Sequence, residues 1–154
     1  MLTIKSRQIY RKELDKKRLQ KVSATAFKFL GFEIEPEVTL QVTDDKTIRE
    51  FNLQYRDTDE ATDVLSFENA FTDPESGETY LGDILISFET AKRQADTREL
   101  GVMTELEMLL VHGILHLAGM DHGATGEWQE MSALQDEILA QLNNPIQNSI
   151  HKPT

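Results

Sequence analysis

The chain has 154 residues, of which 39% are hydrophobic and 28% are charged, so its length and composition predict one compact domain with a buried core. No stretch reaches the roughly 20 consecutive apolar residues of a membrane-spanning helix, and the first residues lack the apolar segment of a secretory signal. Cysteine is absent, which excludes disulfide-linked partners and leaves histidine and carboxylate as ligands for any metal. We expect a cytoplasmic protein with no membrane partner.

The net charge of -11 is unevenly distributed along the chain. Residues 1–28 contain nine of the sixteen basic residues and only two acidic ones, Glu13 and Asp15, so this segment carries +7 and the remainder -18. Two interpretations fit this asymmetry. It is either a solvated helix face that balances an acidic body or a surface that binds RNA phosphates.

Hydrophobic periodicity and turn residues predict the secondary structure. In chain order, the pattern indicates a strand at 2–4, a helix at 13–30, a strand at 38–42, a helix at 44–55, strands at 63–67 and 80–86, and helices at 87–100, 104–118 and 126–142. The mixture without strict alternation favours an α+β fold, in which a small mixed β-sheet packs against several helices. We expect a single metal-dependent hydrolase domain at 1–142 and a flexible tail at 143–154.

Local signals at three places refine these boundaries. Gly31 and Gly119 follow predicted helices and are expected to end them. Thr104 and Glu107 have the spacing of a capping box, which predicts a helix start at Thr104. Segment 67–79 is rich in turn formers and is predicted to be an exposed loop.

Three of the four histidines, His112, His116 and His122, fall within eleven residues. Side chains four residues apart lie on one face of a helix, so His112 and His116 can bind one ion. Gly119 allows the helix to end, so that the chain can turn back and bring His122 to the same ion. Three protein ligands with an open fourth position are typical of catalytic zinc, and this helix is then a zincin-like metal helix. We therefore predict one Zn²⁺ ion on these histidines.

The same histidine spacing occurs in metzincin proteases, where a glutamate after the first histidine is the general base. Here that position is Gly113, which argues against peptide-bond cleavage. Asp121, beside the third histidine, is interpreted as a turn residue or as an acceptor that orients a ligand, in preference to a base.

Three blocks of the sequence resemble the YbeY family of bacterial metal-dependent endoribonucleases. They are the histidine block at 112–122, the segment NLQYRDTDEATDVLSF at 52–67, and LGDI at 81–84. The resemblance implies a single-strand-specific endoribonuclease that matures the 3′ end of 16S rRNA and acts in ribosome quality control. It also implies contact with ribosomal RNA, the small ribosomal subunit and its assembly factors.

The resemblance also implies a catalytic role for Arg56, beside that of His112. A guanidinium can hold a phosphate through two donors and stabilise charge in the transition state. The residues alone favour a surface ion pair of Arg56 with Asp57 or Asp59. Four other residues of these blocks are interpreted as structural: Asn52, Tyr55, Ser66 and Asp83.

Two alternative functions remain open at this level. One is a metal-dependent hydrolase of peptides or small molecules. The other is a non-catalytic ribosome-assembly factor whose zinc only stabilises the fold.

Overall fold

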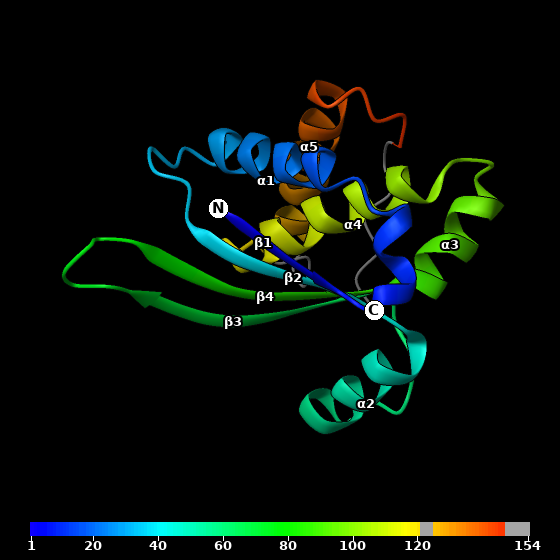
Figure 1. Ribbon diagram of the computed structural model, residues 1–154. Helices are drawn as coiled ribbons and strands as arrows, with labels where there is room; N and C mark the ends of the chain where they lie inside the picture. Colours follow the sequence, from blue (N-terminus) through cyan, green and yellow to red (C-terminus); the bar gives the residue numbers. More distant parts are fainter. Residues whose placement is uncertain (121–124, 147–154) are drawn as a thin grey trace.

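The computed structural model describes residues 1–120 and 125–146, with the side chains of 125–128 excepted (Figure 1). The elements are β1 (Leu2–Ser6), the 3-10 helix η1 (Gln8–Glu13), α1 (Lys16–Phe29), β2 (Glu37–Thr43), α2 (Asp45–Arg56), β3 (Val64–Thr72), β4 (Thr79–Ser87), α3 (Phe88–Thr97), α4 (Val102–Leu117) and α5 (Thr125–Gln141).

The four strands form one mixed sheet in the order β1-β2-β4-β3. β1 and β2 are parallel, as are β2 and β4, whereas β3 runs antiparallel to β4 and forms one edge. The predicted α+β class with a small mixed sheet is therefore confirmed. Valine and leucine alternate with polar residues along β2, so that one face of this strand is buried, as its period of two predicts.

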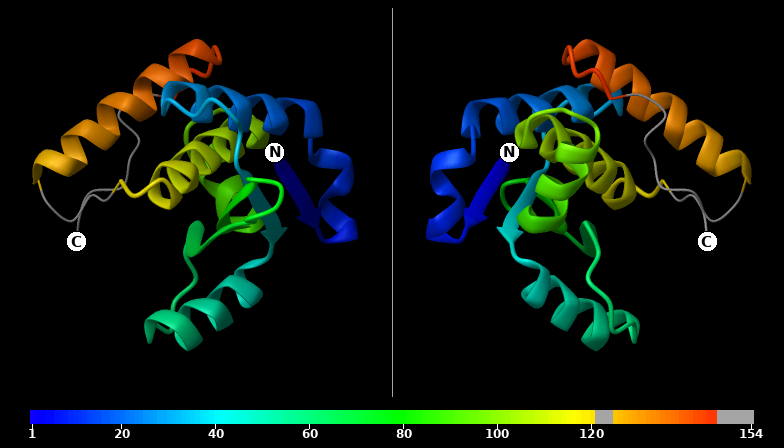
Figure 2. Two further views of the ribbon diagram at one scale, coloured as in Figure 1. Left: turned by 90° about the vertical axis from the view of Figure 1, so that its left-hand side faces the viewer. Right: turned by 90° about the vertical axis from the view of Figure 1, so that its right-hand side faces the viewer.

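Helices cover the sheet on both faces (Figure 2). α1, α4 and α5 lie on one face, and α2 lies on the other, where Ile48 packs with Leu65 and Leu85 in a small second core. α4 is the central helix, because it contacts α1, α3, α5, β3 and β4. Its residues from Glu105 to Leu115 are all buried, as expected for a helix that is apolar on every side.

The predicted loop at 67–79 is instead mostly strand. β3 continues to Thr72 and β4 begins at Thr79, so only 73–78 forms the turn of a long hairpin that projects from the body (Figure 1). The turn is held by the backbone N–H of Gly77, which donates to the carbonyl of Asp73 at 2.8 Å. The exposed end of the hairpin has no apolar alternation, so the sequence resembled a loop although its backbone pairs as a ladder.

The predicted capping box at Thr104 is wrong. α4 begins at Val102, and its N-cap is Gly101, which makes no side-chain cap bond. Glu107 is buried and accepts two hydrogen bonds from Arg18 of α1, at 3.3 and 2.8 Å, because its side chain faces the helix packed against α4. Glu107 therefore forms a long-range ion pair with Arg18 and does not take part in the local cap that the spacing indicated.

Residues beyond the predicted tail boundary at 143 also contact the body of the protein. Asn144 is buried, and its Nδ2 donates to the carbonyl of Thr104 and to Glu107 at 3.0 and 3.1 Å. Ile146 joins the main core. The ordered contacts thus continue through residue 146, and residues 147–154 lie outside the described part.

Across the described residues, no single helix is long and apolar enough to cross a membrane; only α3 and α4 taken together, bent by 116°, meet the criteria of length and composition.

Asp45 joins the N-termini of α2 and α3, and we expect it to make stability depend on pH. Its carboxylate accepts hydrogen bonds from Ser87, Thr90 and Arg93 at 2.5, 2.6 and 2.9 Å. Burial raises the pKa of Asp45, but these hydrogen bonds outweigh it and hold the pKa below its ordinary value.

A lowered folded-state pKa means that the stabilisation is complete above the unfolded pKa of about 4 and is lost as pH falls through the folded value. Asp45→Asn should therefore lower the free energy of unfolding by about 1–3 kcal/mol at pH 7, with a smaller difference near pH 2. Urea unfolding of both proteins from pH 7 to pH 2 measures this, and a difference that is constant with pH would contradict the assignment.

Candidate metal centre and phosphate-binding residue

α4 brings His112 and His116 together, as their spacing predicts. Their ring centroids are 4.7 Å apart and the ring planes are inclined by 70°. His112 is 4% exposed, whereas His116 is half-buried, so the pair lies where the buried helix reaches the surface. The neighbours of both histidines in the sequence of α4 include buried leucine, isoleucine and valine residues, so the helix on which the pair lies is largely apolar.

Gly113, beside His112, lies against the sheet. A Cβ atom at this position would approach Cγ2, Cδ1 and Cγ1 of Ile84 at 2.8, 3.0 and 3.2 Å. The space that a glutamate side chain would need is therefore filled by β4, so the absent protease base reflects the packing of this fold. Ser66 of β3 donates from Oγ to the Gly113 carbonyl at 3.4 Å, which ties the helix to the edge strand beside the histidines.

We predict that Gly113→Ala destabilises the protein although alanine favours helices. Overpacking of a core position costs typically about 1–3 kcal/mol, against a gain of about 1 kcal/mol in helix propensity. In the Ile84→Ala background, which removes all three close atoms, the same change should be neutral or stabilising. Urea unfolding of the four proteins gives the coupling energy, and additive effects would show that Ile84 is not the obstacle.

The expected helix end at Gly119 is confirmed. Gly119 has φ 95°, the left-handed region that glycine adopts without strain. Its N–H donates to the carbonyl of His116, and the Met120 N–H donates to Leu115, both at 3.0 Å, which is the Schellman pattern. The chain therefore turns directly after the second histidine.

His122 and Asp121 lie outside the described residues. Within 1–120 and 125–146, no three histidine, cysteine, aspartate or glutamate side chains form a metal-binding group. The two described histidines nevertheless fit zinc. Imidazoles bonded to one tetrahedral zinc, with Zn–N bonds of about 2.0–2.1 Å, have centroids roughly 5 Å apart, close to the spacing of this pair.

Arg56 lies in the last turn of α2, near the edge strand. Its Nη2 donates to the carbonyl of Ser66 at 3.5 Å, a long and weak hydrogen bond. The side chain of the same serine bonds the carbonyl of Gly113, next to His112. One residue of β3 therefore connects the guanidinium with the helix that carries the histidines.

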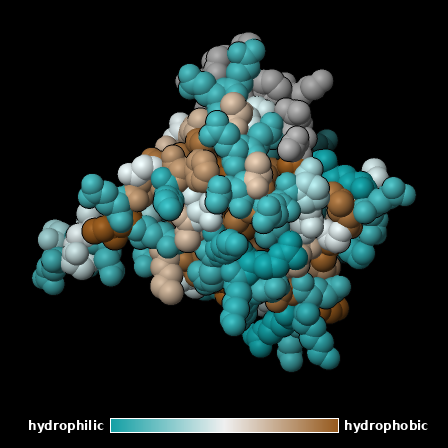
Figure 3. Space-filling view, turned by 90° about the horizontal axis from the view of Figure 1, so that it is seen from above, coloured by the Kyte–Doolittle hydropathy of each residue, from teal (hydrophilic) through white to brown (hydrophobic). Residues whose placement is uncertain are grey.

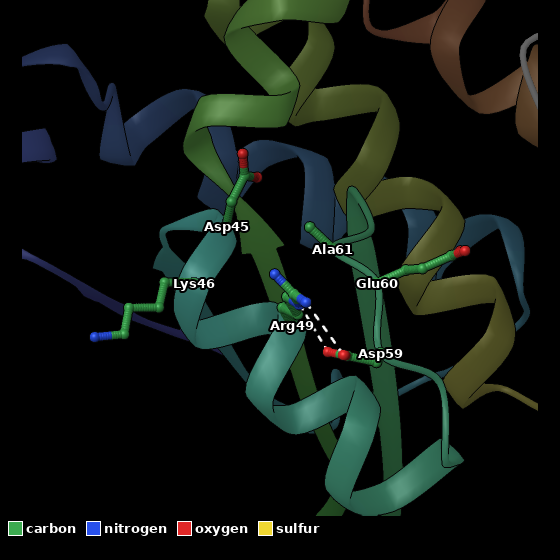
Figure 4. Close-up of a pocket in the computed structure, with 6 residues that line it drawn as sticks. All are labelled: Asp45, Lys46, Arg49, Asp59, Glu60 and Ala61. Carbon is green, nitrogen blue, oxygen red and sulfur yellow. Dashed lines mark hydrogen bonds and ion pairs between the residues drawn. The ribbon is translucent and has the colours of Figure 1, made fainter.

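The expected ion pair of Arg56 with Asp59 is not formed. Asp59 instead accepts two hydrogen bonds from Arg49, at 2.7 and 3.1 Å, within a hollow of about 720 Å³ along α2 (Figure 4). The Arg49 guanidinium lowers the pKa of the Asp59 carboxyl. Over the described part of the chain, Arg56 makes no ion pair, with Asp57 or with any other acid, and its exposed guanidinium is available to a phosphate.

Three of the residues interpreted as structural make structural contacts. Asn52 is buried and donates to the Glu60 carbonyl at 2.9 Å, Ser66 holds α4, and Asp83 accepts a hydrogen bond from the Tyr80 hydroxyl at 2.6 Å. Tyr55 differs from them, because the residue is 59% exposed.

Gly82 is a positioning residue that the sequence reading did not single out. It has φ 149°, and a Cβ atom there would lie 2.1 Å from the Phe67 carbonyl oxygen and 3.1 Å from Leu117. Only glycine lets β3 and α4 approach at this point. A glycine inside a predicted strand was the available signal.

The basic N-terminal segment is divided between structural and exposed groups. Arg7 pairs with Asp44, and Arg18 pairs with Glu107. The lysines of α1 are exposed. Seen from above, the surface of the molecule is mostly hydrophilic (Figure 3). These two arginines are therefore held in ion pairs within the protein, whereas the exposed lysines are compatible with both interpretations of the charge asymmetry.

Known proteins resemble the chain over nearly its whole length. The family model described as Endoribonuclease YbeY matches residues 2–143. An Endoribonuclease YbeY from Aquifex aeolicus is 38% identical over 139 residues, which cover 88% of this chain and 89% of the relative. The one from Moorella thermoacetica is 43% identical over 130 residues, which cover 79% of this chain and 83% of the relative.

A solved structure has the same fold. The solution structure of TM1509 from Thermotoga maritima superimposes with a TM-score of 0.58 at 23% identity, covering 99% of this chain and 98% of that one. Together with the sequence matches, which extend across both the histidine block and the Arg56 segment, this settles the relationship: the chain belongs to the YbeY family of endoribonucleases.

Proposed function

We propose that this chain is a zinc-dependent, single-strand-specific endoribonuclease that acts in 3′-end maturation of 16S rRNA and in ribosome quality control. His112, His116 and His122 hold one zinc ion, and Arg56 binds the phosphate at which the RNA is cleaved. The protein acts in the cytoplasm, where ribosomal RNA, the small ribosomal subunit and its assembly factors are its partners. The main support is the pair of histidines one helical turn apart on α4, in a chain of an endoribonuclease family.

The residues supply complementary parts of the chemistry. Zinc, when bound, provides Lewis-acid chemistry, which polarises phosphoryl oxygens and lowers the pKa of water that it binds. Arg56 exchanges its weak bond to the Ser66 carbonyl for two charge-assisted bonds to a phosphate. It then neutralises the negative charge that increases on the phosphoryl group during attack. Both groups therefore act on a phosphodiester.

Packing also argues against the peptidase alternative. The metzincin reaction uses a carboxylate directly after the first histidine, and Ile84 fills that space here. A phosphodiester carries a negative charge that a guanidinium can bind, whereas a peptide bond carries none. The guanidinium, which Ser66 connects to the histidine helix, is thus better matched to RNA.

Substrate class is tested by incubating one zinc-analysed preparation with precursor 16S RNA and with casein. We expect cleavage of single-stranded RNA near the 3′ end and intact casein. Chelation separates the assembly-factor alternative: activity should disappear while circular dichroism and the unfolding temperature remain nearly unchanged. Loss of the fold on chelation, without any RNA cleavage beforehand, would instead identify a structural zinc.

A further inference from the structure

Three aromatic rings lie together where α2 crosses β3. Tyr55 and Phe51 are stacked, with centroids 5.8 Å apart and planes inclined by 17°. Phe67 contacts Tyr55 edge-on at 5.4 Å and Phe51 at 6.0 Å. Phe51 and Phe67 are partly buried against the small core below the sheet, so they fix the cluster to the fold.

Tyr55 is the exposed member of this cluster. The residue is 59% exposed although its ring is supported by two others, and residues 53–61 around it are all exposed. The helix ends one residue later, since Asp57 has φ 54° and its N–H donates to the Leu53 carbonyl at 3.1 Å. A rigidly supported ring with accessible surface is the kind of platform on which nucleobases stack.

The platform also lies next to the proposed phosphate ligand. Arg56 follows Tyr55 directly and reaches the carbonyl of Ser66, whereas the ring of Tyr55 contacts Phe67, the next residue of β3. Two adjacent residues of α2 therefore contact two adjacent residues of the edge strand. An RNA strand bound by its phosphate at Arg56 has a base within reach of Tyr55.

We propose that Tyr55 stacks on one unpaired nucleobase adjacent to the phosphate held by Arg56, an inference that rests on the RNA substrate of the proposed function. A base in a duplex already has both faces covered by its neighbours, whereas an unpaired base can be turned onto an aromatic ring. Stacking at this position therefore selects single-stranded RNA.

The test uses binding without cleavage. Single-stranded RNAs, each with one abasic nucleotide at a different position around the cleavage site, are titrated in EDTA against wild type, Tyr55→Leu and Tyr55→Phe. Tyr55→Leu keeps an apolar cover over Phe51 and Phe67 but removes the ring, whereas Tyr55→Phe keeps the ring. Phe71→Leu is the matched control, since Phe71 is a 63% exposed aromatic on the hairpin outside this cluster.

We expect the wild type, Tyr55→Phe and Phe71→Leu to lose about tenfold in affinity at one abasic position. Tyr55→Leu should bind the intact RNA about tenfold more weakly and lose nothing further at that position. When 2-aminopurine replaces the base at that position, its fluorescence should be quenched on binding to the wild type. This readout does not depend on how any variant folds. An abasic profile unchanged in Tyr55→Leu, or an unquenched 2-aminopurine at every position, would overturn the inference.

Failure of the two proposals can be told apart. RNA that is cleaved with zinc but shows no position-specific dependence on Tyr55 overturns the stacking inference alone. RNA that is bound with the Tyr55-dependent profile but is never cleaved overturns the catalytic function and leaves the stacking inference standing. A wild type that binds no RNA overturns both.

Discussion

We expect His112→Ala to lose bound zinc and RNA cleavage together. His112 is one of two histidines whose rings are 4.7 Å apart, and a single remaining imidazole on α4 cannot hold the ion in the same way. Since removing only a partner of a metal ligand costs about 10–100-fold in affinity or activity, removing the ligand itself should cost at least about 100-fold. Metal analysis and the rate of single-stranded RNA cleavage measure the two effects on one preparation.

Two variants control for damage to the fold, because His112 is only 4% exposed. His112→Gln keeps most of the side-chain volume and should give the same double loss with an unfolding temperature closer to that of the wild type. His151→Ala removes the histidine outside the block and should retain both zinc and activity. If a folded His112→Ala or His112→Gln kept its zinc and its cleavage rate, the metal assignment would be wrong.

We expect Arg56→Ala to keep zinc but to lose about 10²-fold or more in kcat/KM on single-stranded RNA. The guanidinium is exposed and bonds only weakly to Ser66, so its removal should change the unfolding temperature little. Arg56→Lys should recover only part of the loss, because an ammonium cannot donate two parallel hydrogen bonds to one phosphate. Steady-state kinetics beside metal analysis separates this effect from loss of the ion.

Arg49→Gln is the matched control for Arg56, since both arginines are exposed on α2. Arg49 pairs with Asp59, and both side chains are exposed, so that water and salt screen the pair and its loss should change stability little. Its cleavage rate should therefore equal that of the wild type. Equal losses of activity in both variants would indicate a general effect of charge and would contradict a specific role for Arg56.

Sequence reasoning succeeded where the determinants are local. Histidines four residues apart must share a helical face, and a glycine three residues after the second one predicted where the helix ends. Caps are readable for the same reason, because a cap binds an N–H three residues ahead: Ser87 was a candidate cap of α3, and Asp44 or Asp45 of α2, and the structure has Ser87 and Asp44 in these positions.

Two of the errors came from contacts that residue spacing does not reveal. Glu107 pairs with Arg18, 89 residues earlier, and so does not cap its own helix. Asp59 pairs with Arg49 of the preceding helix and not with the nearer Arg56. Neither choice can be read from spacing. The first depends on which faces α1 and α4 present to one another, and the second on how the loop after α2 lies along that helix.

The absence of a glutamate at position 113 was visible in the sequence, but its physical reason was not. Ile84, 29 positions earlier, fills the space in which a side chain would lie. The aromatic cluster could not be seen in the sequence either. Tyr55 was predicted to be structural, and only the structure shows its exposure and its contact with Phe67.

The most direct test of a zinc-dependent endoribonuclease is the rate of single-stranded RNA cleavage as a function of the zinc bound per chain. The protein is first stripped with a chelator and then titrated with zinc, while its fold is followed by circular dichroism. We predict that the rate is negligible in the stripped, folded protein and rises with bound zinc until one ion per chain is reached. A stripped protein that cleaves RNA at the full rate would contradict the proposal.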